Sequence, residues 1–559
     1  MKLNVSILAL AAIPLSWLLP NHYPPWVSAG QEGLALLLLF AAALFARRPV
    51  APPGLWVAAV GVAACSVVLQ WGTGRVTFGG DVLMVLLYLA AFVLSIALGS
   101  TLDDKPSGTS LSALETVALG CLLSAIVSVG IALAQWTGSV SLGIWGADLP
   151  RGARPFANVA QPNHLSTLAF MGLCSLALLR ETARVGATGF WLGATFFVAG
   201  MVMSVSRTGW LQVGAMVLLA LVFQRRTASR LRAAHIGAIA ALYAVGTLAW
   251  PWLNDVLLLS GGRGVTQQIE GGARGPLWLA LLDAVTREPW WGYGWQQVAA
   301  AQQAVALDHP PVQRHFEHSH NIVLDLLLWA GIPVGGLIAA LCATALFKQA
   351  RALRDARALW LFAAVLGVVL HGMLELPLEY AYFLLPLGLC IGAMAALQPT
   401  GGLLLRVPVA ALRLSGALLM ALLLWVGTEY LQAEQAHRTL RLESARIGVS
   451  GIQTPPPQLR LLTQLDAFLR FAQTEAREGM TREEVAWMGQ VSERFAYPQA
   501  MLRYALAAGL NGQPERAALT LARLCRIHPI ERCREARESW AALQGKFTVL
   551  RGQPPPTLP

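Results

Sequence analysis

The chain alternates between long hydrophobic stretches and short polar connections over most of its length. Thirteen stretches are candidates for transmembrane helices, because about 20 mostly apolar residues span the hydrocarbon core of a bilayer. They lie near residues 4–20, 28–46, 54–71, 82–99, 111–136, 163–179, 186–204, 209–223, 233–252, 321–347, 358–376, 381–397 and 415–429. The pattern predicts a membrane domain over residues 1–429, with a long connection at 253–320, and a separate polar helical tail over 430–559.

Composition supports this interpretation. Of the 559 residues, 56% are hydrophobic and 13% are charged, and the mean hydropathy is +0.55. Soluble globular chains carry about 25% charged residues. The low charge therefore excludes a soluble enzyme, a disordered protein and a nucleic-acid-binding protein, despite the formal net charge of +11. We predict an all-α polytopic membrane protein with about 13 transmembrane helices.

The distribution of Lys and Arg predicts the orientation, because positive residues in short loops stay in the cytoplasm. If the N-terminus is inside, sixteen basic residues fall on the inner side, namely Lys2, Arg47, Arg48, Lys105, Arg180, Arg184, Arg225, Arg226, Arg230, Arg232, Lys348, Arg351, Arg354, Arg357, Arg406 and Arg413. Four fall in short outer loops, namely Arg75, Arg151, Arg154 and Arg207. Thirteen spans then place the tail outside. The first stretch is expected to be a retained helix, because no small-residue cleavage site precedes Pro20.

The tail contains a pair of cysteines that allows two interpretations. Cys525 and Cys533 flank a turn signal at His528-Pro529. They could close a helical hairpin as a disulfide in an oxidising compartment, or remain as two buried thiols. The run from Tyr504 to Ala517 resembles the turn of a tetratricopeptide-type hairpin, and both a helical cap and a protein-docking surface remain open. No metal-ligand spacing such as CxxC or HExxH occurs in the sequence, so we expect no metal site.

The long connection at 253–320 is too rich in particular residues to be filler. It contains Gly261-Gly262, Gly271-Gly272, the arginines 263, 274, 287 and 314, and the cluster Trp290-Trp291-Gly-Tyr-Gly-Trp295. Loops longer than about 15 residues are usually functional or disordered, and this density of aromatic residues argues against disorder. The tryptophans could be interfacial anchors or a stacking platform for sugars.

Polar residues gather at the helix ends that the predicted topology places outside. These are Gln161, Asn163 and His164 before the sixth span, Ser206-Arg207-Thr208 between the seventh and eighth, Glu317, His318, His320 and Asn321 before the tenth, and His371, Glu375, Glu379, Tyr380 and Tyr382 between the eleventh and twelfth. Each alone would more often be a helix cap, but four groups on one side favour a functional site. Arg207 and Arg274 suit a phosphate or pyrophosphate, and a histidine at the water boundary suits a general base. The sequence shows no Gly-rich loop that would bind a nucleotide, and no ATP is present outside the inner membrane. An activated lipid-linked sugar is therefore the expected donor, and no cofactor is expected.

Several of these motifs resemble the O-antigen ligase/polymerase superfamily, and most closely the bacterial protein O-oligosaccharyltransferases of the PglL, or pilin glycosylation, type. His320-Asn321, nine residues and Gly331 match its histidine motif, with Val334 and Gly335 departing slightly at the end. Arg274, Trp278, Pro289 and Gly292-Tyr-Gly294 are similar to the pattern of its long loop. Ser206-Arg207-Thr208-Gly209 matches its arginine motif, and the run from Arg154 to Leu165 resembles a segment of the protein-glycosylating branch.

The resemblance implies transfer of an oligosaccharide from undecaprenyl pyrophosphate to Ser or Thr of a pilin or other exported protein, at the periplasmic face of the bacterial inner membrane. It implies that His320 is the general base and that Arg207 and Arg274 stabilise the pyrophosphate, in a metal-independent displacement with inversion. Gln161 would place donor or acceptor, and Tyr380 is preferred over Tyr382 for a similar role. Glu375 would orient an arginine or form a structural ion pair. Asn163, His318 and Asn321 complete the expected binding residues, and periodicity does not decide between His318 and His320 as the base.

Three rival functions remain open. An O-antigen ligase acting on lipid A–core and an O-antigen polymerase share the same chemistry and differ in the acceptor. A lipid-sugar flippase or other transporter would place its polar groups near the middle of the bilayer. The expected polar groups lie at helix ends instead, which favours an enzyme.

Overall fold

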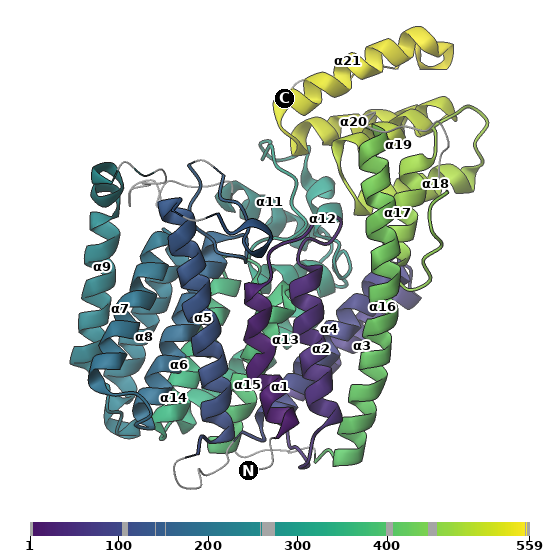
Figure 1. The fold of residues 1–559 in the computed structure, drawn as a ribbon. Coiled ribbons are helices and arrows are strands. Elements are labelled where there is room, and N and C mark those ends of the chain that lie inside the picture. Colours follow the sequence, from purple (N-terminus) through teal and green to yellow (C-terminus); the bar gives the residue numbers. More distant parts are fainter. Residues whose placement is uncertain are drawn as a thin grey trace. The chain divides into compact units, whose positions relative to one another are not determined.

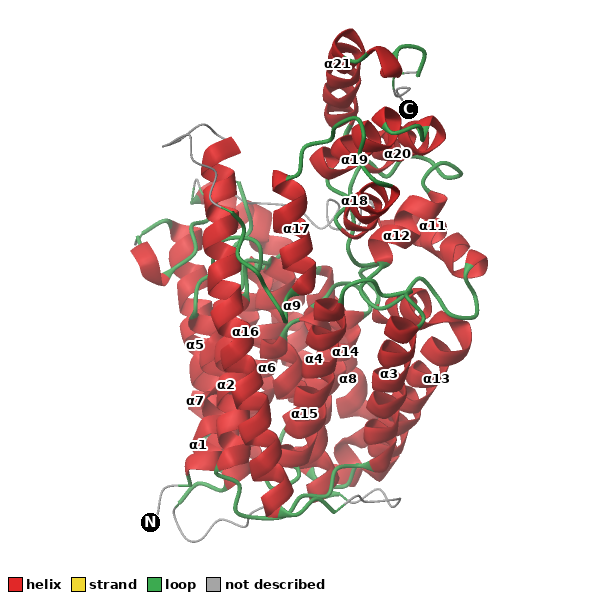
Figure 2. Ribbon diagram, turned by 90° about the vertical axis from the view of Figure 1, so that its right-hand side faces the viewer, coloured by secondary structure: helices red, strands yellow, loops and turns green. Residues whose placement is uncertain are grey.

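The fold of the described part of the chain is helical throughout. The computed structural model describes residues 4–102, 110–139, 141–150, 152–257, 259, 274–398, 406–444, 455–553 and 555. Lys2, Lys105, Arg151, Arg263 and the glycine pairs at 261–262 and 271–272 lie outside these residues. In the described residues every regular element is a helix, and extended pairing is limited to one isolated bridge between Val50 and Val407 (Figure 2). The predicted all-α class is confirmed.

The hydrophobic stretches form helices of two lengths. Within the described part of the chain, eight helices are long and apolar enough to cross a bilayer, namely α3 (Gly54–Gly72), α4 (Gly79–Gly99), α5 (Ala113–Thr137), α6 (Pro162–Glu181), α8 (Arg207–Thr227), α9 (Ala233–Val256), α13 (Ile322–Ala352) and α16 (Val409–Ser444). Five shorter apolar segments coincide with the other predicted stretches: α1 with η1 (Val5–Ala12 and Ile13–Leu18), α2 (Ala29–Leu44), α7 (Ala187–Met203), α14 (Ala356–Gly372) and α15 (Ala381–Leu397). The chain is thus a multi-pass membrane protein by the length and composition of its helices.

The chain divides into two compact units. The first comprises residues 1–61, 87–270 and 340–425, and the second comprises residues 62–86, 271–339 and 426–559. The predicted boundary at 429–430 falls inside α16, which continues without interruption to Ser444. The polar tail therefore shares a unit with the segment that precedes α13.

The first unit is a helical bundle with α6 at its centre. Helix α6 packs against α5, α7, α8 and α14 (Figure 1). Most of its side chains are buried. Pro162 occupies the first turn of α6, where its missing N–H costs nothing. Helix α5 begins with a capping box between Ser112 and Glu115 and ends at Gly138, whose φ of 61° suits glycine. The first turn of the central helix thus holds the predicted residues Asn163 and His164.

The second unit holds short helices beyond the long spans. These are α11 (Arg274–Arg287), α12 (Val298–Val305), α17 (Thr463–Gln473), α18 (Arg482–Arg494), α19 (Pro498–Leu510), α20 (Pro514–Ile527) and α21 (Ile530–Lys546). Prolines at the first positions of α19 and α20 and a capping box at Thr481 and Glu484 define the starts of the tail helices. The tail surrounds its own hydrophobic core, which includes Met488 and Trp540.

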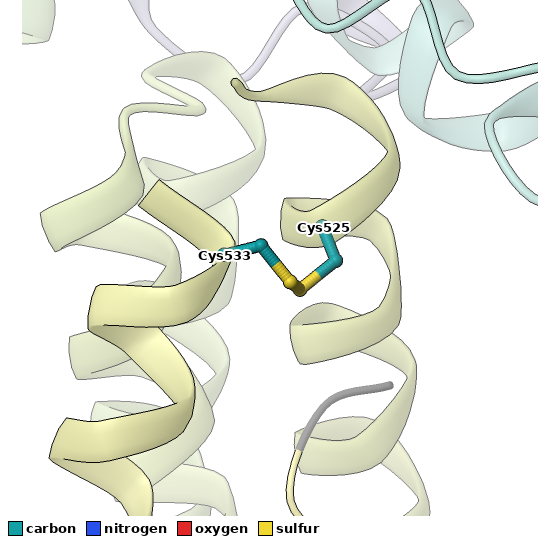
Figure 3. Close-up of a disulfide and its surroundings, with 2 residues drawn as sticks. All are labelled: Cys525 and Cys533. Atoms are coloured by element: carbon teal, nitrogen blue, oxygen red, sulfur yellow. A yellow bond between two sulfur atoms is a disulfide. The ribbon is translucent and has the colours of Figure 1, made fainter. Parts of the chain in front are cut away.

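A disulfide joins the last two tail helices. Cys525 on α20 and Cys533 on α21 are bonded, and both side chains are buried (Figure 3). The sequence left open a disulfide or two buried thiols, and the structure contains the disulfide. The cross-link closes the turn at His528-Pro529 and fixes α21 to the rest of the tail.

Candidate active site

The segment that carries His320, residues 306–321, is irregular and leads into a capped helix. Helix α13 begins at Ile322, and the Asn321 side chain accepts hydrogen bonds from the backbone N–H groups of Val323 and Leu324 at 3.0 and 3.2 Å. Asn321 is therefore the N-cap of α13. His320 precedes it with a φ of 59°, in the left-handed region that a side chain rarely adopts. Strained residues of this kind are enriched at functional sites.

Contacts from three helices hold this segment in place. Trp278 on α11 donates from its indole nitrogen to Ser319 O at 2.7 Å. The buried carboxylate of Asp325 on α13 accepts from Ser319 N at 2.8 Å. Gln302 on α12 accepts from Phe316 N at 3.0 Å and donates to Arg314 O at 2.9 Å. Because the segment has no regular structure of its own, these contacts define where His320 lies.

Arg274 acts electrostatically on His320. Arg274 is the first residue of α11, one helical turn before Trp278. The pKa of His320 is lowered to about 4, first by burial and then by the charge of Arg274, with further effects of His318 and Arg314. A histidine with this pKa is neutral at pH 7 and can accept a proton. The site thus combines the neutral imidazole of His320 with the guanidinium group of Arg274, which is suited to binding an anion.

His318 lies in a different environment from His320. Its ring is 6.4 Å from the ring of Trp329, and burial lowers its pKa while the charge of Asp325 raises it. The ring of His320 instead meets Phe316 edge-on, with the centroids 5.5 Å apart. Both histidines lie outside regular helix, as the sequence allowed. Among the charged groups that lower the pKa of His320, Arg274 has the largest effect.

Glycines of the long connection meet a break in α13. Gly331 has a φ of 73° inside α13, and this frees carbonyl groups of the preceding turn. Tyr293 N donates to Leu328 O at 2.7 Å, and Gly294 N donates to Trp329 O at 3.1 Å. A Cβ at Gly331 would lie 2.5 Å from the backbone of Trp290. The Gly-x-Gly run and the glycine of the histidine motif thus form one backbone contact.

The tryptophans of the connection separate into two environments. Trp290 and Trp291 are 71% and 54% exposed, as interfacial anchors or stacking surfaces would be. Trp295 is buried, stacks on Trp329 with centroids 4.9 Å apart and donates to Ser66 at 2.9 Å. The cluster is therefore partly surface and partly core.

In the first unit, Arg207 stands at the start of α8. Ser206 caps this helix by accepting from Thr208 N at 3.1 Å, and Val205 before it has a φ of 47°. Arg154 donates to the carbonyl oxygens of Ser204 and Val205 at 3.2 and 2.9 Å and so supports the turn. The Arg207 side chain is exposed and has no hydrogen-bond or ion-pair partner among the described residues. It is available to an anionic ligand.

Asn163 links two predicted site residues. Its amide nitrogen donates to Glu375 at 3.0 Å, and its amide oxygen accepts from the Ser206 hydroxyl at 2.7 Å. Glu375 follows α14 and is almost fully buried. Both polar ends of Asn163 are thereby occupied by protein groups. The sequence predicts that Asn163 binds substrate and that Glu375 orients an arginine or forms an ion pair. In the structure, their hydrogen bonds connect the end of α14 to the turn that bears Arg207.

Aromatic rings enclose His164 next to this link. The His164 ring lies edge-on to Tyr380, with centroids 4.9 Å apart, and its Nδ1 is 3.5 Å from the Tyr382 hydroxyl. Tyr382 is buried, whereas Tyr380, the N-cap residue of α15, is half-buried. Gln161, the N-cap residue of α6, is also half-buried, and its side chain does not cap the helix. Tyr380 and Gln161 are thus the more accessible members of this group.

Several supporting residues were not identified from the sequence. Glu32 on α2 is buried and accepts from Trp26, Ser28, Tyr88 and the backbone N–H of Ala381. It thereby fixes the turn between Tyr380 and Tyr382. A lone acidic residue in an apolar stretch was the available signal, since burial of a carboxylate requires hydrogen-bond donors.

The predicted residues therefore fall into two groups. Arg274, His318, His320 and Asn321 belong to the second unit, and Gln161, Asn163, Arg207, Glu375, Tyr380 and Tyr382 belong to the first. Among the described residues, no three His, Cys, Asp or Glu side chains come together as a metal site requires. Each group combines an arginine with side chains held by buried hydrogen bonds.

Comparisons with known proteins relate both groups to one superfamily. A family model described as O-antigen ligase matches residues 192–339, which include Arg207, Arg274 and His320. A model described as the C-terminal part of a virulence factor membrane-bound polymerase matches residues 359–542, which include Glu375, Tyr380 and most of the tail. No solved structure matches the chain.

Two curated relatives come from Acinetobacter baylyi. The chain is 28% identical over 542 residues to a protein named general O-oligosaccharyltransferase, covering 94% of this chain and 93% of the relative. It is 29% identical over 241 residues to a ComP-specific O-oligosaccharyltransferase, covering 43% of each chain. The chain therefore contains a region that matches the O-antigen ligase family, and it is similar over nearly its whole length to an O-oligosaccharyltransferase.

Proposed function

We propose that the protein transfers an oligosaccharide en bloc from undecaprenyl pyrophosphate to Ser or Thr hydroxyl groups of a pilin or another exported protein. The observation that carries the proposal is the hydrogen bond from Trp278, one turn after Arg274 on α11, to the carbonyl oxygen of Ser319, the residue before His320. Burial and the charge of Arg274 lower the pKa of His320 to about 4, so its imidazole is a base at neutral pH. A base next to a cation suits the attack of a hydroxyl group on a donor that leaves as an anion. The names of both relatives support a transferase of oligosaccharides.

In the proposed reaction, the acceptor hydroxyl loses its proton to the His320 imidazole. The hydroxyl oxygen forms a bond to the anomeric carbon, and the bond from that carbon to the pyrophosphate oxygen breaks with inversion. Arg274 and Arg207 stabilise the departing pyrophosphate through their guanidinium groups. The reaction uses no metal ion, and undecaprenyl pyrophosphate remains in the bilayer.

The other residues have supporting roles in this proposal. Gln161 and Tyr380 place the donor or acceptor, because both are accessible in the first unit. His318 and Asn321 shape the histidine segment, and Asn321 does so as the cap of α13. Asn163, Glu375 and Tyr382 support substrate binding by positioning other groups. Asn163 and Glu375 hold the turn that bears Arg207, and Tyr382 contacts the ring of His164.

We further propose thirteen spans, with the N-terminus in the cytoplasm and both the catalytic face and the tail in the periplasm. Helices α7, α14 and α15 have 17 residues each, at the lower limit of about 17 residues for a span. The disulfide between Cys525 and Cys533 suits an oxidising compartment such as the periplasm. The hairpins of the tail helices suit a tetratricopeptide-like fold that follows a membrane domain of residues 1–429.

One alternative acceptor is favoured by a specific observation. The match of residues 192–339 to a model described as O-antigen ligase supports a ligase acting on lipid A–core, or a polymerase, as the second candidate. A transporter function has no comparable support, because the polar groups described above lie at helix ends.

The experiment that tests the proposal uses purified full-length protein and a lipid-linked oligosaccharide, with pilin and lipid A–core offered side by side. Glycan should appear on pilin, and His320→Ala should abolish it while the protein still inserts and folds. His22→Ala, which changes an exposed histidine outside the site, is the matched control and should keep full activity. Transfer to lipid A–core alone, or full activity of His320→Ala, would overturn the proposal.

A further inference from the structure

The polar tail contacts the segment that carries His320. The Tyr497 hydroxyl, between α18 and α19, donates to a carboxylate oxygen of Glu317 at 3.0 Å. Glu317 lies three residues before His320, in the irregular segment described above. Tyr497 and Glu317 are 180 residues apart in the sequence. We propose that Arg494 and Tyr497 are positioning residues for this segment, so that the tail forms part of the support of the active site; the inference rests on the proposed role of His320.

A buried ion pair fixes the tail residue Arg494. Arg494 binds both carboxylate oxygens of Asp81, in the first turn of α4, at 2.9 and 3.0 Å. Their side chains are only 14% and 5% exposed. Separating the two partners of such a buried pair would leave an uncompensated charge. The pair therefore strongly favours one position for the C-terminal end of α18. Arg494 is therefore tied to the start of an apolar helix that is a candidate span.

The charge of Arg494 also acts on Glu317. Burial alone would raise the pKa of Glu317, but the charges of Arg494, His318 and His315 lower it below its usual value. Glu317 is therefore ionised at neutral pH, and a charged carboxylate accepts a stronger hydrogen bond from Tyr497 than a neutral group would. The ion pair and the tyrosine contact reinforce each other at the same carboxylate.

A second connection joins the same corner of the tail to the histidine segment through α12. Gln303 donates to Glu493 O at 3.0 Å, immediately before Arg494. Its neighbour Gln302 accepts from Phe316 N and donates to Arg314 O. The corner at 493–497 thus reaches residues 314–317 directly through Tyr497 and indirectly through α12. A capping function alone would not require two connections to the same segment.

The strained backbone explains why such support is needed. A left-handed conformation is unfavourable for a residue other than glycine and persists only when surrounding contacts enforce it. His320 has this conformation and lies outside any helix. Loss of the Tyr497 contact should therefore allow the segment to relax and should misplace the imidazole without unfolding the protein.

The test compares Tyr497→Phe with Arg477→Ala in the full-length enzyme. Arg477 forms an exposed ion pair with Glu484 in the same tail and makes no described contact with the histidine segment, so its variant is the matched control. For Tyr497→Phe we expect about a tenfold loss of kcat at an unchanged donor KM, because a hydrogen bond to a charged group is lost. The melting temperature should stay close to that of the wild type, and Arg477→Ala should match the wild type throughout.

Two further measurements keep the proposal falsifiable. Amide hydrogen exchange at Phe316 and Ser319 should accelerate in Tyr497→Phe and not in Arg477→Ala, and this readout does not depend on which acceptor the enzyme uses. Arg494→Lys, which keeps the charge but loses the paired contact, should fall between the wild type and Arg494→Ala in kcat. Unchanged exchange together with unchanged kcat in Tyr497→Phe would overturn the proposal, whereas absent transfer by the wild type would overturn only the proposed function.

Discussion

The indole nitrogen of Trp278 donates a hydrogen bond to the carbonyl oxygen of Ser319, 2.7 Å away. Trp278 lies one turn after Arg274 on α11, so both residues face the same side of the helix. Ser319 immediately precedes His320. The contact therefore joins the helix that begins with Arg274 to the residue before His320, whose pKa is lowered by burial and by the charge of Arg274.

Removing this contact should reduce catalysis more than stability. Trp278→Phe keeps an aromatic ring but loses the donor, and a neutral hydrogen bond is worth about 1 kcal/mol. We expect kcat to fall roughly fivefold if the segment bearing His320 loosens. Steady-state transfer assays measure this directly. Trp252→Phe, at an exposed position outside the site, is the control and should remain within about twofold of the wild type, and equal loss in both variants would argue against a specific role of Trp278.

The low pKa of His320 predicts a broad activity profile on the acid side. A general base is active when neutral, so activity falls as pH drops through its pKa, which burial and then Arg274 lower to about 4. In the wild type, kcat/KM should therefore stay level down to about pH 5. Arg274→Gln removes a repelling charge and should raise the pKa toward its ordinary value of about 6.5, although burial remains.

The acid limb of kcat/KM for Arg274→Gln should accordingly move to higher pH, in addition to a large loss of rate at every pH. His318 and Arg314, the other groups that act on His320, are unchanged in this variant. An acid limb at the same pH in both proteins would show that the titrating group is not His320.

The sequence predicted the helices well because their signal is local. Each of the thirteen apolar stretches coincides with a helical segment, because a helix satisfies the backbone hydrogen bonds of an apolar stretch within the segment itself. The motifs also drew attention to Asn321 and Gly331. Their structural roles, a helix cap and a helix break, required knowledge of which backbone groups they meet.

Other features could not be read from the sequence because they depend on distant partners. Val205 is β-branched and disfavours a positive φ, yet it has one because Arg154 binds the adjacent carbonyl groups. Trp290 and Trp295 belong to one cluster in the sequence, but only the second finds a partner in Trp329. The contact of Tyr497 with Glu317 likewise has no local signal.

The link through Asn163 predicts a distinctive pattern at Glu375. Glu375→Gln retains an oxygen that can accept from Asn163, whereas Glu375→Ala removes it. If Glu375 positions the turn of Arg207 through Asn163, Glu375→Gln should keep most of the activity and Glu375→Ala should lose about tenfold or more, because a buried donor is left unpaired. When the concentration of the lipid-linked glycan is varied, the loss in Glu375→Ala should appear as a higher KM for that glycan. Equal and severe losses in both variants would instead indicate that the negative charge itself is required.

The break in α13 should depend on glycine at position 331. Gly331→Ala places a Cβ 2.5 Å from the backbone of Trp290 at a φ of 73°, so both the clash and the backbone conformation oppose it. We expect destabilisation of about 2 kcal/mol or more, seen as a lower melting temperature in detergent. Gly336→Ala lies in the same helix with open space around the added Cβ and should be neutral or stabilising by about 0.5–1 kcal/mol. If both variants melt at the same temperature, the close approach of the Trp290 backbone to Gly331 does not contribute to stability, and the hydrogen bonds of Tyr293 and Gly294 maintain the break.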